Sequence, residues 1–336
     1  MPQLISDTLM PYAPKGTDEV YLTCGCGSSA NELAFKLAFN NFQKLFPNKP
    51  NPQILSFSGA FHGRLFGSIS TTRSKPIHKV GFPAYNWQGV DFPELKYPYF
   101  LNETHNTEEE NKTLAQVETV LRNSAIAGVI IEPILAEGGD KIASGNFYLG
   151  VQALCKKYGA LFIVDEVQTG GGPTGRFWGH EHWGPRFDAD IVTFAKKLQV
   201  SGLFYKSHLS MKNPEDLFNP FNTDLVRLVN FKIIQRIMKI DRLIKNSEIA
   251  GHALRNGLYA LSEKLPISNI RGQGSFLAYD LPTPSQANAL VNRLLQFGVN
   301  AGVCGTQSIR VRPSLVFEQR HAEVYLERLD AALRSL

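Results

Sequence analysis

The sequence is poor in cysteine and in charge and lacks long hydrophobic runs, and each scarcity excludes a class of protein. Four cysteines in 336 residues are too few for a disulfide scaffold of this size and indicate a reducing compartment. No window approaches the roughly 18 consecutive apolar residues that indicate a membrane-spanning helix. Only 19% of the residues are charged, and the net charge of +5 arises without a cluster of Lys and Arg, so we expect neither a membrane nor a nucleic acid as partner.

The N-terminus carries no recognisable targeting signal. The first twenty residues contain no Arg and include acids at positions 7, 18 and 19, which is typical of neither a signal peptide nor a transit peptide. We therefore expect a cytoplasmic protein. The alternative is the mitochondrial matrix, for a chain whose natural N-terminus is missing.

Length and composition predict a large folded α/β protein. With 43% hydrophobic and 11% aromatic residues the chain can bury a sizeable core, and its length exceeds one ordinary domain. Short apolar runs alternate with amphipathic helical patterns, which indicates a doubly wound, mostly parallel sheet. The expected strands are 20–24, 53–57, 128–132, 161–165 and 191–195, and the clearest helix is 32–45.

The pattern changes in the C-terminal third. Residues 228–264 have a long helical period and are followed by shorter alternating segments, so we place a domain boundary near Asp241. This predicts a large domain at 1–240 and a smaller α+β domain at 241–336. Two polar stretches, 102–111 and 213–222, have no apolar anchor or are rich in Pro and Asn, and both are predicted to be loops.

A turn of small residues precedes the first predicted helix. It contains Gly27 and Ser28, and Ser29 with Glu32 has the pattern of a capping box. Backbone N–H groups at a helix N-terminus, where the macrodipole is positive, bind phosphate well. Taken alone, a well-capped helix without a ligand is the more common outcome.

Three further groups of residues follow predicted strands. Phe61-His62-Gly63-Arg64 offers a ring for stacking and a guanidinium for a carboxylate. Residues 165–168 (DEVQ) end a buried strand, and the absence of a G-x-x-x-x-G-K-[ST] motif excludes a P-loop there. Lys196 and Lys197 follow another strand, where an amine is a candidate for Schiff-base formation.

In a parallel sheet all four groups meet at the carboxyl edge, where such folds bind ligands. A phosphate cradle, a stacking ring, an Asp that keeps a pyridine nitrogen protonated and a Lys that carries an aldehyde together predict a site for pyridoxal 5′-phosphate.

Longer motifs resemble those of a known family, the class III, ω-amino acid aminotransferases, and most of all its members that act on 4-aminobutyrate. The similarity runs from about Leu9 to the C-terminus. It implies a pyridoxal-phosphate-dependent transferase of fold type I, a homodimer with the active site at the interface, and ping-pong transfer of the amino group of 4-aminobutyrate to 2-oxoglutarate through a Lys Schiff base. The motifs are SGAFHGR at 58–64, IEPI at 131–134, EGGD at 137–140, DEVQTGGG at 165–172, TGRFW at 174–178, HEHWG at 180–184 and SIRVRPSLVF at 308–317.

The resemblance also implies the residues that hold the cofactor. Asp165 would pair with the pyridine nitrogen, and Lys197 would form the Schiff base. Lys197 is chosen over Lys196 because the family's Lys precedes a small-residue pair, here Ser201 and Gly202, by four or five positions. The full expected set, from phosphate to ring and amine, is Gly27, Ser28, Thr223 reaching the partner subunit's cofactor, Phe61, His62, Asp165, Gln168 and Lys197.

The resemblance implies the substrate contacts as well. Arg64 would hold the distal carboxylate, and Arg310 the α-carboxylate of glutamate or 2-oxoglutarate. Glu132 would pair with Arg310 while 4-aminobutyrate occupies the site, and it joins Lys197 and Asp165 as an expected catalytic residue.

The sequence departs from the family at three places. No long segment precedes the position of Leu9, the loop after Thr223 is shortened, and Val200 is a larger residue beside the expected Lys. Two alternatives therefore stay open: another ω-amino acid aminotransferase, for β-alanine, lysine or ornithine, and a truncated, catalytically impaired homologue. We expect no metal site, because Cys26 lacks a second Cys three residues on and His180-x-His182 has the character of packing.

Overall fold

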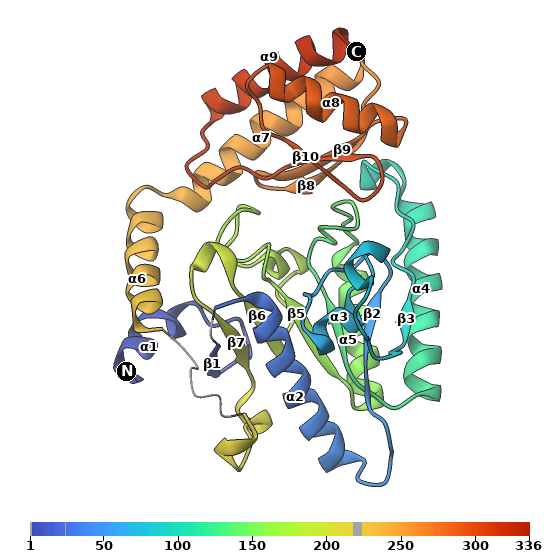
Figure 1. The fold of residues 1–336 in the computed structure, drawn as a ribbon, viewed down its shortest axis with the longest axis vertical. Helices are drawn as coiled ribbons and strands as arrows, with labels where there is room; N and C mark the ends of the chain where they lie inside the picture. The colour runs from blue at the N-terminus through green and yellow to red at the C-terminus, as the bar shows by residue number, and fades with distance from the viewer. Residues whose placement is uncertain (1, 24, 218–223) are drawn as a thin grey trace.

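The computed structural model describes residues 2–23, 25–217 and 224–336, and over these residues it contains two β-sheets covered by helices (Figure 1). The strands of the larger sheet are β1 (Glu19–Thr23), β2 (Gln53–Phe57), β3 (Gly89–Val90), β4 (Ile126–Ile131), β5 (Leu161–Asp165), β6 (Ile191–Phe194) and β7 (Ser201–Tyr205). Their spatial order is β1-β7-β6-β5-β4-β2-β3.

The larger sheet is mostly parallel, which confirms the predicted fold class. β2, β4, β5 and β6 run parallel to one another, whereas β7 is antiparallel to both β6 and β1. All five predicted strands are present, and their ends lie within two residues of the predicted ends. The parallel strands therefore deliver their carboxyl ends to one edge of the sheet.

Helices cover both faces of this sheet. The helices before residue 241 are α1 (Pro2–Thr8), α2 (Gly27–Leu45), α3 (Phe66–Thr71), α4 (Glu103–Asn123), α5 (Gly145–Tyr158) and α6 (Leu225–Ile240). α2 lies on one face, and α4 and α5 lie on the other (Figure 1). None of the described helices has both the length and the hydrophobicity to span a membrane.

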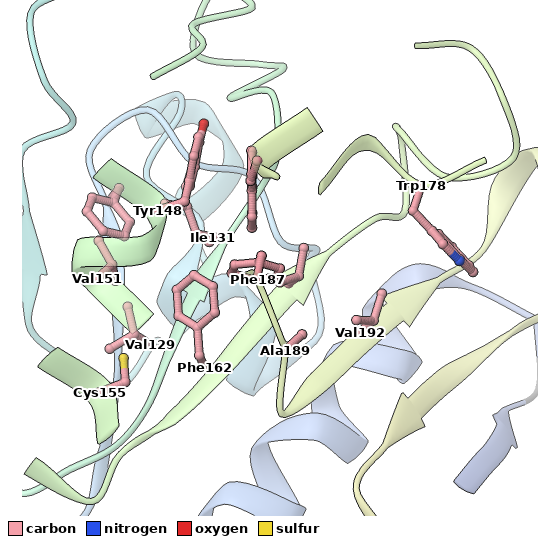
Figure 2. Packing of buried hydrophobic residues seen from close by; sticks show 14 of the residues in the cluster. Val129, Ile131, Tyr148, Val151, Cys155, Phe162, Trp178, Phe187, Ala189 and Val192 are labelled. Atoms are coloured by element: carbon pink, nitrogen blue, oxygen red, sulfur yellow. The ribbon is translucent and has the colours of Figure 1, made fainter. Parts of the chain in front are cut away.

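Alternate residues of each strand enter different cores. On β5, Leu161 and Ile163 pack on the α2 side, whereas Phe162 and Val164 pack on the α5 side. Figure 2 shows the second core, where Phe162 lies near Val151 of α5. Because both faces are apolar, the strand appears in the sequence as one continuous apolar run rather than as an alternating pattern.

Helix α4 shows that the predicted loop at 102–111 is wrong. The first half of this helix buries polar side chains, Asn106 and Glu110. Asn106 pairs with the backbone N–H and C=O of Lys96 at 2.8 and 2.9 Å, and Glu110 accepts hydrogen bonds from the N–H and hydroxyl of Ser144 at 2.7 and 2.6 Å. Apolar periodicity misses such a helix because hydrogen-bonded polar groups occupy its buried face.

The remaining helices cover the smaller sheet, whose strands are β8 (Ser268–Gln273), β9 (Phe276–Asp280), β10 (Gly302–Cys304) and β11 (Ser308–Val311). This sheet is antiparallel throughout, in the order β10-β11-β9-β8. It packs against α7 (Leu243–Ser262), α8 (Pro284–Gln296) and α9 (Gln319–Arg334), which lie above it in Figure 1. Arg242, with a φ of +50°, separates α6 from α7. The boundary between a large domain at 1–240 and a small one at 241–336 stays a prediction.

The buried contact of Glu110 gives a test of how α4 is held. Glu110→Ala should lower the melting temperature by several degrees, because two partly buried donors of Ser144 lose their acceptor at a cost of roughly 1–3 kcal/mol. The matched control is Glu108→Ala, an exposed carboxylate on the same helix, which should leave the melting temperature nearly unchanged. Equal melting temperatures for the two variants would contradict this role of Glu110.

Candidate active site

A cavity of about 290 Å³ lies at the carboxyl edge of the larger sheet. Its walls come from the turn before α2, from the segments that follow β2, β4, β5 and β6, and from the first turn of α6. The lining residues include Gly27, Ser28, Phe61, His62, Glu132, Asp165, Gln168 and Lys196. The four groups of residues that the sequence singles out therefore meet at one site, at the carboxyl edge of the sheet.

The N-terminus of α2 forms one wall of this cavity. Its N-cap, Cys26, has extended backbone, and no described side chain caps the helix. A Cβ on Gly27 would lie 2.5 Å from both γ-carbons of Val167, and a Cβ on Gly63 would lie 2.3 Å from the Ser28 hydroxyl. The backbone can pack this closely against Val167 and Ser28 only because these positions are glycine. The first-turn N–H groups are available to an anion.

The predicted capping box at the start of α2 is wrong. The Glu32 carboxylate does not return to the helix start; it accepts a hydrogen bond from the backbone N–H of Ser68 at 2.6 Å. This contact joins α2 to α3, and it leaves the helix N-terminus open toward the cavity.

Asp165 ends β5 and is held by three segments. Its Oδ2 lies 2.8 Å from His62 Nδ1 and 2.9 Å from Asn31 Nδ2, and its Oδ1 accepts from the N–H of Val167 at 3.1 Å. Asn31 is held in turn by the hydroxyl of Thr193 at 2.8 Å. The carboxylate is only 4% exposed, so these bonds fix its direction as well as offsetting its burial. His62 thus lines the cavity and supports Asp165 from one side.

Glu132 follows β4 and is buried beside Asp165. It accepts hydrogen bonds from the backbone N–H groups of Phe61 at 3.0 Å and Ala136 at 3.2 Å. Burial, and then the charge of Asp165, raise the pKa of Glu132 to about 8. Glu132 therefore keeps a proton at neutral pH when the cavity contains protein groups alone.

The lysine that lines the cavity is Lys196, not Lys197. Both lie in the 3-10 turn Lys196–Leu198 after β6, where consecutive side chains point in different directions. Burial lowers the pKa of Lys196, and the negative charge of Asp165 partly opposes that shift. The backbone of Lys196 is left-handed, with a φ of +49°. The predicted spacing to Ser201 did not separate the two lysines, because a gap of four or five positions admits both.

Arg310, on β11 of the smaller sheet, pairs with a different carboxylate from the one predicted. Its Nη1 lies 2.9 Å from Oε1 of Glu137, whereas both oxygens of Glu132 accept backbone N–H groups. The Glu132–Arg310 pair, which is predicted for a site that holds 4-aminobutyrate, is not formed in this structure. Burial disfavours ionisation of Glu137, but the charges of Arg310 and Arg312 outweigh it and hold its pKa below the ordinary value.

Arg312 belongs to the site as well. It lies within the motif SIRVRPSLVF, but the motif alone does not indicate a role for it. Its guanidinium donates to Gln168 Oε1 at 2.8 Å and to the carbonyl of Ala136 at 3.0 Å, and it contacts the Asp140 carboxylate. It also lies over the ring of Phe276, 4.6 Å from the centroid. Arg312 thus ties β11 to Gln168 in the cavity wall. Arg312 follows β11 directly, two residues after Arg310, and this spacing is the sequence signal that could have revealed it.

Two further predicted residues, besides Lys197 and Arg310, lie outside the cavity wall or outside the described structure. Arg64 is exposed, and its guanidinium lies 5.4 Å from the centroid of the Phe61 ring. Thr223 and residues 218–222 of the second predicted loop lie outside the described residues, so their positions stay predictions.

Both histidines of the His180-x-His182 pair are hydrogen-bonded within the protein. His180 lies 2.7 Å from Glu166 through its ring, and His182 lies 3.0 Å from the Thr174 carbonyl. Glu166 is completely buried and also accepts from the hydroxyl of Thr169 and from the N–H of Gly179. Within 2–23, 25–217 and 224–336 no group of three or more His, Cys, Asp or Glu side chains is arranged to hold a metal ion.

Three comparisons with known proteins point to one family. The family model described as aminotransferase class-III matches residues 2–333. A 4-aminobutyrate aminotransferase from Dictyostelium discoideum is 40% identical, over 100% of this chain and 72% of its own length. A mitochondrial 4-aminobutyrate aminotransferase from Sus scrofa is 39% identical, over 96% of this chain and 69% of its own. The structure of a lysine aminotransferase from M. tuberculosis has a TM-score of 0.91 at 27% identity, over 99% of this chain and 78% of its own.

The raised pKa of Glu132 gives a test by pH. Between about pH 5 and pH 8 the folded chain holds a proton on Glu132 that the unfolded chain has lost, so this group lowers the stability of the wild type as pH rises. Glutamine does not titrate. Glu132→Gln should therefore gain stability relative to the wild type over this range, by several degrees in melting temperature, and the gain should level off above pH 8.

The control for this measurement is Glu137→Gln. Because the pKa of Glu137 is lowered in the folded chain, its carboxyl is ionised in both states from about pH 5 upward, and its difference from the wild type should stay constant. A difference for Glu132→Gln that is equally constant between pH 5 and pH 8 would show that Glu132 is not protonated in the folded protein.

Proposed function

Because the chain belongs to the class III aminotransferase family, we propose that it transfers the amino group of 4-aminobutyrate to 2-oxoglutarate, giving succinate semialdehyde and glutamate. The observation that carries the proposal is the position of Lys196. Its amine shares the cavity with two buried carboxylates, Asp165 and Glu132, and with the uncapped N-terminus of α2. Amine, acid and anion-binding turn are the parts that this chemistry needs.

The cavity fits pyridoxal 5′-phosphate. Gly27, Ser28 and Gly63 line the cavity at the α2 N-terminus, where the first-turn N–H groups would hold the phosphate. The ring of Phe61 lines the wall as well. Bound there, the cofactor supplies an electron sink for the carbon that carries the substrate amine. Asp165 would hold the proton of the pyridine nitrogen, and Gln168 would hydrogen-bond the ring oxygen.

We assign the reactive amine to Lys196 in place of Lys197. Its Nζ would take the proton from the substrate carbon and return it to the cofactor carbon in each half-reaction. The lowered pKa of Lys196 supports this role, because an amine must be unprotonated to act as nucleophile or base.

The substrate carboxylates would be held by two arginines. Arg64 would bind the distal carboxylate common to 4-aminobutyrate and 2-oxoglutarate. Arg310 would bind the α-carboxylate of 2-oxoglutarate or glutamate, and it would stay paired with Glu137, as at 2.9 Å here, while 4-aminobutyrate is bound. Because of its pair with Glu137, the guanidinium of Arg310 keeps a charged partner when the substrate has no α-carboxylate.

We further propose a homodimer, as the resemblance implies. Helix α6 supports it, because its outer face carries exposed apolar side chains that a partner would cover: Leu225, Val226, Val229, Ile233 and Ile237. The role of Thr223 toward the partner subunit's cofactor remains part of this proposal. Cytoplasmic placement also stays a prediction, with the mitochondrial matrix as the alternative.

Trapping the reactive lysine tests the proposal directly. Protein loaded with pyridoxal 5′-phosphate is reduced with borohydride, digested and mapped by mass spectrometry. We expect the label on Lys196, its loss in Lys196→Ala, and an unchanged label in Lys197→Ala, together with glutamate formation from 4-aminobutyrate and 2-oxoglutarate by the wild type. A label on Lys197, or turnover of lysine or ornithine but not of 4-aminobutyrate, would contradict the assignment.

Half-reaction kinetics test the role of Arg310. Arg310→Ala should slow the half-reaction with 2-oxoglutarate by roughly 100-fold, because the α-carboxylate loses a charged partner, and it should affect the 4-aminobutyrate half-reaction far less. Arg320→Ala removes an exposed arginine from the same unit and should change neither. Equal losses in both half-reactions of Arg310→Ala would show that Arg310 does not distinguish the two substrates.

A further inference from the structure

The cavity wall contains a second basic side chain besides Lys196, that of Arg227. The negative charge of Asp165 acts on Lys196. Arg227 comes from another element, the first turn of α6, and none of the roles described above uses it. Its charge is therefore unexplained by the reaction and by the fold.

Arg227 lies against the turn that leads into α2. The position of a Cβ on Gly25 would be 3.5, 3.6 and 3.8 Å from Nη2, Cζ and Nη1 of Arg227. Three nearly equal distances mean that the plane of the guanidinium faces Gly25. The backbone of Gly25 has a φ of +103°, and its N–H is held by the hydroxyl of Ser201 at 2.9 Å. The turn at Gly25 is thus held in place. The Arg227 guanidinium lies directly against its backbone, because Gly25 has no side chain.

Arg227 has unused hydrogen-bonding capacity. Its own backbone N–H bonds the Asp224 carbonyl at 3.0 Å, within the start of α6. Over the residues that the structure describes, its guanidinium forms neither a hydrogen bond nor an ion pair, although the side chain is half-buried. A planar fork of N–H donors beside an anion-binding helix terminus is suited to a phosphate group.

A bound phosphate would need more positive charge than the α2 N-terminus supplies. A phosphate monoester carries between one and two negative charges at neutral pH, whereas a helix N-terminus contributes about half a positive charge. Ser28 offers a neutral hydroxyl. The amine of Lys196 is committed to the other end of the cofactor, so it does not compensate the phosphate.

We propose that Arg227 is a phosphate-binding residue for pyridoxal 5′-phosphate, supplied by the same chain that supplies the α2 N-terminus. This inference rests on the proposed function for its ligand, but it concerns a residue and an element that the family motifs above do not include. It predicts that Arg227 contributes to binding only when the ligand carries a phosphate.

Two ligands that differ only in the phosphate test the proposal. The affinity of the cofactor-free protein for pyridoxal 5′-phosphate and for pyridoxal is measured by fluorescence titration. Arg227→Gln should weaken pyridoxal 5′-phosphate by roughly 10- to 100-fold and leave pyridoxal within about twofold, and Arg227→Lys should lie between the wild type and Arg227→Gln. The control Arg236→Gln removes an exposed arginine from the same helix and should bind both ligands like the wild type.

Wild-type affinity of Arg227→Gln for pyridoxal 5′-phosphate would overturn the inference. So would an equal loss for both ligands, since that pattern indicates a distorted cavity rather than a lost phosphate contact. Melting temperatures of the variants, with and without inorganic phosphate, add an independent arm: phosphate should stabilise the wild type more than Arg227→Gln. If the wild type binds neither form of pyridoxal, the proposed function fails, and the phosphate arm alone decides the role of Arg227.

Discussion

The burial of one carboxylate, that of Asp165, is the constraint on which the arrangement of elements around the larger sheet depends. A charge removed from water is tolerated only when partners surround it, and here the partners come from separate elements. Asn31 belongs to α2, His62 follows β2, and Thr193 of β6 holds Asn31 in place. The network therefore fixes the spacing of three elements about the end of β5, and it determines the shape of the cavity that these elements enclose.

The smaller sheet completes the site from the opposite side. β11 carries Arg310 and is followed directly by Arg312, and both arginines reach acidic side chains in the segment after β4. Arg271 of β8 adds a hydrogen bond to the carbonyl of Gly139 in the same segment, at 2.9 Å. These contacts mean that residues 137–140 are held between the two sheets. A displacement of the smaller sheet would therefore change the positions of Gln168 and of the proposed substrate-binding residue Arg310 together.

The sequence predicted which segments meet at the site better than it predicted which side chains pair with one another there. Strand ends and the residues that follow them could be found because buried parallel strands are apolar on both faces and stop at polar groups. Lys196 could not be separated from Lys197, because spacing along the chain does not fix the direction of side chains in a 3-10 turn. Glu137 was missed as the partner of Arg310, because which of two nearby carboxylates reaches an arginine depends on the tertiary fold. Glu32 was misjudged for the same reason, since its partner Ser68 lies far along the chain.

The left-handed backbone of Lys196 bears on how its amine can move. Gln199, three residues on, is also left-handed, with a φ of +57°, so the turn holds two non-glycine residues in a conformation that costs free energy and persists only where the surroundings enforce it. The backbone of this turn is therefore rigid and does not act as a hinge. The amine can then move only by rotation about the bonds of its own side chain, which contains four methylene groups. The distance over which Lys196 can carry a proton from one carbon atom to another is therefore limited by the length of this side chain.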